Sequence, residues 1–134
     1  MNEALTALML GHAPLAALVE NRVHWRMQPR SVSGFPYVNL AVISDPRAYH
    51  MAGASALRST RVQVDAWAET YAAAKAVSRT VDDFLSGYRG TSGGIHFQGV
   101  FVSDERDLTD KTTGEERQLF RISVDLQISW YKEA

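Results

Sequence analysis

The most constraining feature of this sequence is the stretch RVQVDAWAETYAAAKAV, residues 61–77, because its hydrophobic period changes halfway along. Residues 61–68 alternate between apolar and polar side chains, as in a β-strand with one buried face. From Tyr71 onward, apolar residues recur every three or four positions, as on an amphipathic helix. Thr70 stands at the change and is a good N-cap residue. We therefore expect a strand that runs directly into a helix, with both burying the same side of one core.

The same two periods predict the remaining elements. Helices are expected between Asn2 and Gly11, around residues 14–19, and between Thr70 and Gly87, with Asn2 and Thr70 as caps and Gly87 as a C-terminal stop. Strands are expected over residues 22–25, 36–44, 57–68, 95–103 and 117–131. The apolar phase of the strand over 95–103 slips at Gly99, which predicts a bulge there. Residues 44–55 are expected to form a connecting loop.

The order of these elements, α-α-β-β-β-α-β-β, contains no repeated strand–helix–strand unit, which argues against a doubly wound parallel sheet. The alternating strands instead favour a mostly antiparallel β-sheet that is packed on one face by the helices. The strand over 36–44 is apolar at nearly every position, so it is either buried on both faces or central in the sheet. The chain of 134 residues is expected to form a single α+β domain, residues 1–134.

The last strand is long for a domain of this size. Residues 117–131 would span about 50 Å if fully extended, whereas a compact chain of this length has a diameter of about 36 Å. Either the strand bends, or the long hairpin around residues 104–117 projects from the body. A projecting polar hairpin could grip a neighbouring molecule.

Residues and motifs typical of catalytic, metal-binding or phosphate-binding sites are sparse. There is no cysteine, and the four histidines are scattered over different expected elements: His12, His24, His50 and His96. No close histidine pair suggests a metal site. The glycine-rich stretch GYRGTSGG, residues 87–94, lacks the Lys-Ser/Thr pair of a phosphate-binding loop and follows a helix rather than preceding one. The sequence therefore predicts no catalytic, cofactor-binding or metal-binding residues.

The charge balance and hydropathy exclude two further classes. A formal net charge of −1 argues against a protein that wraps nucleic acid, although not against a ring through which DNA passes. No apolar run approaches the ~20 residues of a membrane-spanning helix. The N-terminal stretch opens with an acidic residue and is interrupted at Gly11 and Pro14, so it is read as helix rather than signal peptide. A soluble protein made in the cytoplasm is expected.

Aromatic residues in polar surroundings are the best candidates for a binding surface. Trp67 stands on the polar side of its strand, where either the start of the helix or a loop covers it, or an assembly buries it. Tyr131 would lie on the same face if the two strands share a sheet. Arg47, Tyr49 and His50 give the 44–55 loop a composition typical of interfaces.

Three segments, taken together, resemble a known family. They are NRVHWRMQPRSVSGFPYVNLAVIS at 21–44, LRSTRVQVDAWAETYAAAKAVSRTVDDFLSGYRG at 57–90, and GIHFQGVFVSDERDLTDKTTGEERQLFRISVDLQISWYK at 94–132. This linked set is similar to the tail completion proteins of long-tailed bacteriophages, which are related to the tail terminators at the head–tail junction. Gene transfer agents use the same part. The similarity covers nearly the whole chain, in the same order.

The resemblance implies a structural role without catalysis or cofactors. Proteins of this family form a ring, usually a hexamer, on the head-proximal end of the tail tube, where the ring ends polymerisation and joins the tail to the head connector. The implied partners are other copies of the chain, the tail tube protein and the connector proteins, with DNA only passing through the lumen and no membrane. The implied location is the virion tail, after synthesis in the host bacterial cytoplasm.

A ring needs two different matching patches on one chain. We expect Arg106, Asp107, Asp110 and Lys111, on the hairpin around 104–117, to form ion pairs between subunits. Three alternatives stay open at this point: another neck or head-completion protein, a small-ligand enzyme on an α+β scaffold, and a dimeric binding module.

Overall fold

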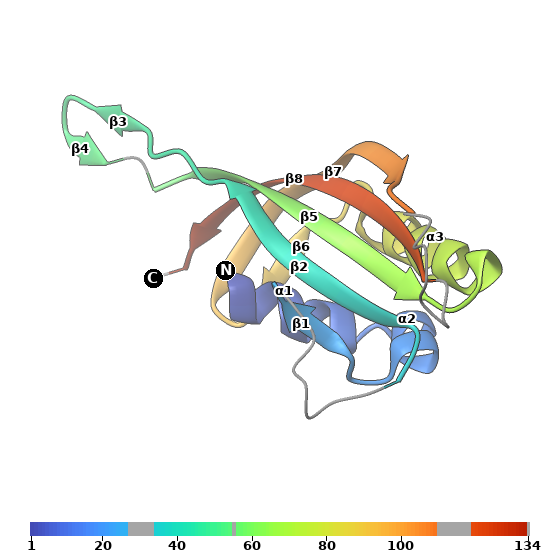
Figure 1. The fold of residues 1–134 in the computed structure, drawn as a ribbon. Helices are drawn as coiled ribbons and strands as arrows, with labels where there is room; N and C mark the ends of the chain where they lie inside the picture. The colour runs from blue at the N-terminus through green and yellow to red at the C-terminus, as the bar shows by residue number, and fades with distance from the viewer. Residues whose placement is uncertain (27–33, 55, 110–118, 134) are drawn as a thin grey trace.

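The computed structural model describes residues 1–26, 34–54, 56–109 and 119–133 (Figure 1). The helices are α1 (Asn2–Leu10), α2 (Ala13–Val19) and α3 (Tyr71–Leu85). The strands are β1 (Val23–Trp25), β2 (Tyr37–Ser44), β3 (Tyr49–His50), β4 (Gly53–Ala54), β5 (Arg58–Ala68), β6 (Gly90–Ser92), β7 (Ile95–Asp107) and β8 (Phe120–Lys132). The predicted order is present, with three short strands that the sequence did not indicate: β3 and β4 in the 44–55 loop, and β6 in the glycine-rich stretch.

The main strands form one curled sheet, comparable to half of a barrel, with the order β1-β2-β5-β8-β7-β6. Strand β1 runs parallel to β2, whereas the other neighbouring strands are antiparallel. The sheet is therefore mixed, which corrects the expectation of a mostly antiparallel sheet in one respect. The parallel register places Val23, His24 and Trp25 of β1 opposite Val38, Asn39 and Leu40 of β2.

The transition from strand to helix is confirmed. On β5, the side chains of Val62, Val64 and Ala66 are buried. The Thr70 hydroxyl then accepts a hydrogen bond from the backbone N–H of Ala73 at 3.1 Å, which caps α3. The buried side chains of α3 face the same core: Ala74, Val77, Ser78, Val81 and Leu85. Strand and helix thus cover opposite sides of one apolar layer.

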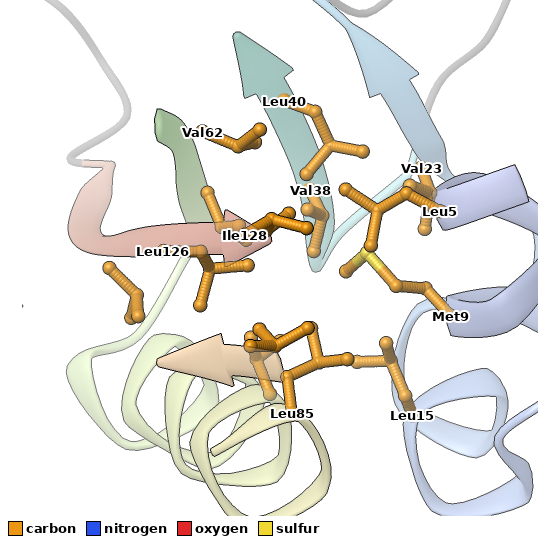
Figure 2. Close-up of a cluster of buried hydrophobic side chains, with 14 of the residues drawn as sticks. Leu5, Met9, Leu15, Val23, Val38, Leu40, Val62, Leu85, Leu126 and Ile128 are labelled. Atoms are coloured by element: carbon orange, nitrogen blue, oxygen red, sulfur yellow. The ribbon is translucent and has the colours of Figure 1, made fainter. Parts of the chain in front are cut away.

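The core lies between the sheet and the helices, all on one side of the sheet (Figure 1). The helices contribute leucine, valine and methionine, and the strands contribute mostly β-branched residues and leucine. Figure 2 shows Leu5, Met9, Leu15 and Leu85 from the helices gathered against Val38, Leu40, Leu126 and Ile128 from the sheet. Burial of each such side chain stabilises the fold by about 1.5–3 kcal/mol.

Two local expectations are wrong. Strand β2 is neither central nor buried throughout: Val38 and Leu40 are buried, but Val42 and Ile43 are exposed. The reason is that β1 ends at Trp25, opposite Leu40, so the second half of β2 continues beyond its edge neighbour. Asn2 is not a side-chain cap, because it already lies inside α1, with Met1 at the cap position.

Strands β7 and β8 are bent along their length (Figure 1). The bulge at Gly99 is confirmed by a register shift between Phe97 and Gly99. A second shift between Val102 and Asp104 lets β7 continue to Asp107, beyond its expected end. The far end of β7 curves over α3, where Lys75 forms an ion pair with Glu105 at 3.2 Å. Of the predicted hairpin, residues 110–118 lie outside the described residues, so its projection from the body stays a prediction.

Candidate assembly surfaces

One broad candidate surface is the outer face, which we define as the side of the six-stranded sheet that the helices do not cover (Figure 1). Its side chains are mainly polar, and they come from β2, β5, β7 and β8. They include Asn39, Gln63, Asp65, Trp67, Arg106, Arg121, Ser123, Asp125 and Gln127. Cross-strand register places these residues side by side, so the face forms one continuous layer.

Trp67 lies at one end of the outer face, between two neighbours from adjacent strands. Its ring stacks on Tyr37, with centroids 6.2 Å apart and planes 14° from parallel. The guanidinium of Arg121 lies over the same ring, 5.3 Å from its centroid. Tyr37 and Arg121 therefore cover Trp67, in place of the helix start or loop that the sequence suggested. Its indole Nε1 is buried without a hydrogen-bond partner among the described residues.

A charged pair holds this end of the face together. Arg121 donates from Nη2 to Asp65 Oδ2 at 2.9 Å, and Gln63 donates to Asp65 Oδ1 at 3.0 Å. Asp65 is buried, so these bonds offset the cost of removing its charge from water. Burial raises the pKa of the Tyr37 hydroxyl, and the nearby Asp65 carboxylate raises it further. The network thus favours the neutral form of the Tyr37 hydroxyl.

Two charged residues on the described part of the predicted hairpin, Arg106 and Asp107, already have partners in their own chain. Arg106 forms ion pairs with Asp125 at 3.2 Å and with Asp104 at 3.4 Å. The Asp107 carboxylate accepts hydrogen bonds from the side chain and backbone of Thr109, which lower its pKa. Ion pairs of Arg106 and Asp107 between subunits stay a prediction and would require an exchange of partners. Asp110 and Lys111 lie outside the described residues.

Tyr131 shares the outer face with Trp67 but lies at its other end. Trp67 pairs with Arg121 in the register of β5 and β8, and Tyr131 lies ten positions further along β8. That separation corresponds to roughly 33 Å along a strand. The ring of Tyr131 contacts His96, with centroids 4.8 Å apart. The two aromatic residues therefore cannot belong to one small contact patch.

A second candidate surface is the arm, which we define as residues 45–54. Strands β3 and β4 pair within it as a short hairpin that begins with Tyr49 and His50, and Arg47 precedes this hairpin. Figure 1 shows the arm extending beyond the end of the main sheet. Its Tyr49 side chain is 73% exposed and Met51 is fully exposed. Met51 was not predicted as an interface residue. The signal available in the sequence was a large apolar side chain within an expected loop.

A cluster of hydrogen bonds fixes the base of the arm to the sheet. The Asp45 carboxylate accepts from Arg58, from Thr60 at 3.0 Å, and is paired with Arg47 at 3.0 Å. The buried Thr60 hydroxyl oxygen in turn accepts from Trp130 Nε1 at 2.9 Å. Although burial alone would raise the pKa of Asp45, the bonds from Arg58, Thr60 and Arg47 lower it below its ordinary value.

A third feature is the α1 groove, which we define by its lining residues Asn2, Glu3, Thr6, Ala7, Leu10 and Trp25. It has a volume of about 580 Å³ and a mainly apolar wall. Trp25 Nε1 donates to the Thr6 hydroxyl at 2.8 Å, which fixes the indole ring against α1. The groove therefore has a defined shape.

Nothing in the described residues indicates a catalytic centre. No cluster of three or more His, Asp or Glu side chains in the described residues could hold a metal ion. None of the helices described here is long and apolar enough to cross a membrane. Several charged groups of the outer face are paired with one another, as Arg121 is with Asp65 and Arg106 with Asp125.

Comparison with known proteins decides the family. The family profile described as Tail completion protein gp17 matches residues 3–131. This chain belongs to that family. The family consists of structural phage tail proteins and is not an enzyme family, which agrees with the resemblance noted from the sequence.

Solved structures support the assignment. A chain in the virion of a native gene transfer agent particle is similar over 97% of this tail completion chain and 96% of its own length, at 25% identity and a TM-score of 0.69. A second solved structure is similar over 98% of this chain and 92% of its own length, at 19% identity and a TM-score of 0.50, which indicates a shared fold alone. No curated protein sequence matches this chain.

Proposed function

We propose that this protein caps the head-proximal end of a phage or gene transfer agent tail tube as a ring. In this role it ends polymerisation of the tube and joins the tail to the connector of the filled head. Its partners are other copies of itself, the tail tube protein and the connector proteins, while DNA passes through the lumen. The ring is expected to be six-fold.

The observation that carries this proposal is the family match over residues 3–131. The similar chain from a gene transfer agent virion supports it, because that chain is part of an assembled particle and is matched along nearly its whole length. Together they favour a structural tail component of the virion over an enzyme.

The surfaces of the protein suit a ring of identical subunits. A ring is built from head-to-tail contacts, so one patch must match a different patch on the next copy. The arm and the outer face differ in shape and chemistry: the arm exposes Tyr49 and Met51, whereas the outer face carries paired charges such as Asp65 and Arg121. A two-fold dimer would instead require one self-complementary patch.

The test combines purified protein with the polymerising tail tube protein of the same particle. If the protein caps tubes, adding it should stop elongation and shorten the tubes seen by electron microscopy, in proportion to its concentration. Protein unfolded by heat is the control. Tubes that grow to the same length with and without native protein would contradict the proposal.

A second candidate, another neck or head-completion protein, also fits presence in a virion particle. It predicts binding to the head connector without binding to the tail tube. Co-sedimentation with isolated tubes and with isolated connectors separates the two functions. Binding to connectors alone would favour this second candidate.

A further inference from the structure

Exposed apolar side chains concentrate at the arm and its base. Tyr49 and Met51 lie on the arm, while Val42, Ile43 and Leu57 flank its base, and all five are exposed. Single exposed apolar residues are ordinary, but a group on one projecting element marks a surface that another protein covers. The arm therefore has the character of a contact element on the described surface.

The arm cannot cover these side chains by folding onto the α1 groove of its own chain. Asp45 ties the base of the arm to Arg58 and Thr60 of β5, which sets the direction in which the arm leaves the sheet. Figure 1 shows that it extends away from α1, beyond the end of the sheet. A cover must come from another molecule.

The α1 groove offers a matching apolar site on the same chain. Ala7, Leu10 and Trp25 provide apolar walls, and the volume of about 580 Å³ lies within the range of sites that bury a small ligand. Such a groove can take a methionine or a tyrosine side chain. Methionine suits an interface because its flexible side chain adapts to the shape of the groove. Tyrosine suits an interface because it combines a large apolar ring with a polar hydroxyl group.

The charges of the two surfaces are complementary. At the base of the arm, Arg47 and Arg58 share the single carboxylate of Asp45, and residues 46–54 contain no acidic residue. In the α1 groove, the one charged lining residue is Glu3. The surplus positive charge of the arm therefore meets the carboxylate of Glu3 when the two surfaces come together.

We propose that the arm of one subunit docks in the α1 groove of the next copy of this chain, with Met51 and Tyr49 against Ala7, Leu10 and Trp25. The contact joins two different surfaces, so repetition produces a head-to-tail assembly that closes as a ring. This inference rests on the proposed ring and names the contact that builds it.

Site-specific crosslinking tests the contact, because the natural chain contains no cysteine. The double variant Met51→Cys/Ala7→Cys is treated with a short bismaleimide and resolved on a denaturing gel. Its matched control is Met51→Cys/Ala72→Cys, in which the second cysteine replaces an exposed alanine of α3. Circular dichroism checks that both variants fold, and Glu3→Cys replaces Ala7→Cys if that variant does not.

The groove variant should give a ladder of covalent multimers at several times the yield of the Ala72 control. Mixing the two single variants, Met51→Cys and Ala7→Cys, should give dimers but no longer ladder. Equal yields from groove and control variants would overturn the inference, as would protein that stays monomeric at every concentration. Tube capping by the unmodified protein is a separate measurement, so the inference can fail while the proposed function stands.

Discussion

Replacing Asp45 by asparagine should destabilise the protein at neutral pH, and the effect should disappear in acid. Asp45 accepts hydrogen bonds from Arg58 and Thr60 and forms an ion pair with Arg47. Asparagine is nearly isosteric and keeps one carbonyl acceptor, so the loss is mainly that of the negative charge. Because Thr60 also accepts from Trp130, the change reaches a buried part of the sheet.

The magnitude follows from the contacts and their exposure. Hydrogen bonds to a charged group contribute about 1.5–3 kcal/mol each when they are shielded. The side chains of Asp45 and Arg58 are 28% and 26% exposed and that of Arg47 is 51% exposed, so solvent weakens these pairs, most of all the one with Arg47. We expect a total loss of about 1–2 kcal/mol, which lowers the melting temperature of a chain of this size by roughly 4–8 °C.

The pH dependence has a definite sign. The folded protein holds the pKa of Asp45 below its ordinary value, so the unfolded chain binds the proton more readily. The stabilisation is therefore fully present above the ordinary carboxyl pKa of about 4, and it is lost as the pH falls through the lower folded value. The difference between natural protein and Asp45→Asn should be constant near neutrality and shrink below about pH 4.

Thermal unfolding followed by circular dichroism between pH 3 and pH 8 measures both effects. The matched control is Asp83→Asn, which removes a carboxylate from an exposed position on α3 and should change stability by less than about 0.5 kcal/mol. The reasoning would be refuted if the two variants melted together at pH 7. It would also be refuted if the deficit of Asp45→Asn persisted unchanged at pH 3.

Further predictions concern the core, the cap and the outer face. Phe97 is fully buried, so Phe97→Ala should cost about 3–5 kcal/mol in urea unfolding, whereas Phe101→Ala, at an exposed position, should cost far less; equal losses would be inconsistent with the core. Thr70→Ala removes the cap of α3 and should cost about 1 kcal/mol in the same assay, so an unchanged midpoint would contradict the cap. Asp65→Asn should lower the pKa of Tyr37 but leave it above its ordinary value, because burial is the larger cause; tyrosinate absorbance measures this, and an unchanged pKa would exclude the contribution of Asp65.

The sequence predicted those parts of the fold that depend on local period and on single special residues. The change of period after residue 68, the cap at Thr70, the bulge at Gly99 and the stop at Gly87 are all present. Each has a local physical cause, such as the positive φ of 78° at Gly87, which glycine adopts without strain.

The sequence could not predict which strands the short strands pair with, or where they end. Strand β1 has three residues and β3 and β4 have two each, which is too short for an alternating pattern to show. The parallel register of β1 depends on where the chain re-enters the sheet after residue 36, not on the composition of β1. Likewise, the exposure of Val42 and Ile43 follows from the early end of β1, which no feature of β2 reveals.

The candidate interface residues were partly recognisable. Arg47 and Tyr49 stood out by composition, and the structure places both on a projecting arm. Trp67 and Tyr131 were correctly assigned to one face, but their separation along β8 depends on the register between strands. The partner of Arg106, Asp125, lies on the neighbouring strand, and a pairing across strands cannot be deduced from the alternation of either strand alone.

The most direct test of the central claim is to locate the protein on the assembled particle. Antibody raised against the purified protein, coupled to gold and viewed by electron microscopy, would mark its position on intact particles and on free tails. The account predicts label at the junction of head and tail, and at one end only of each free tail. Label along the tail shaft, or at the tail tip distant from the head, would contradict it.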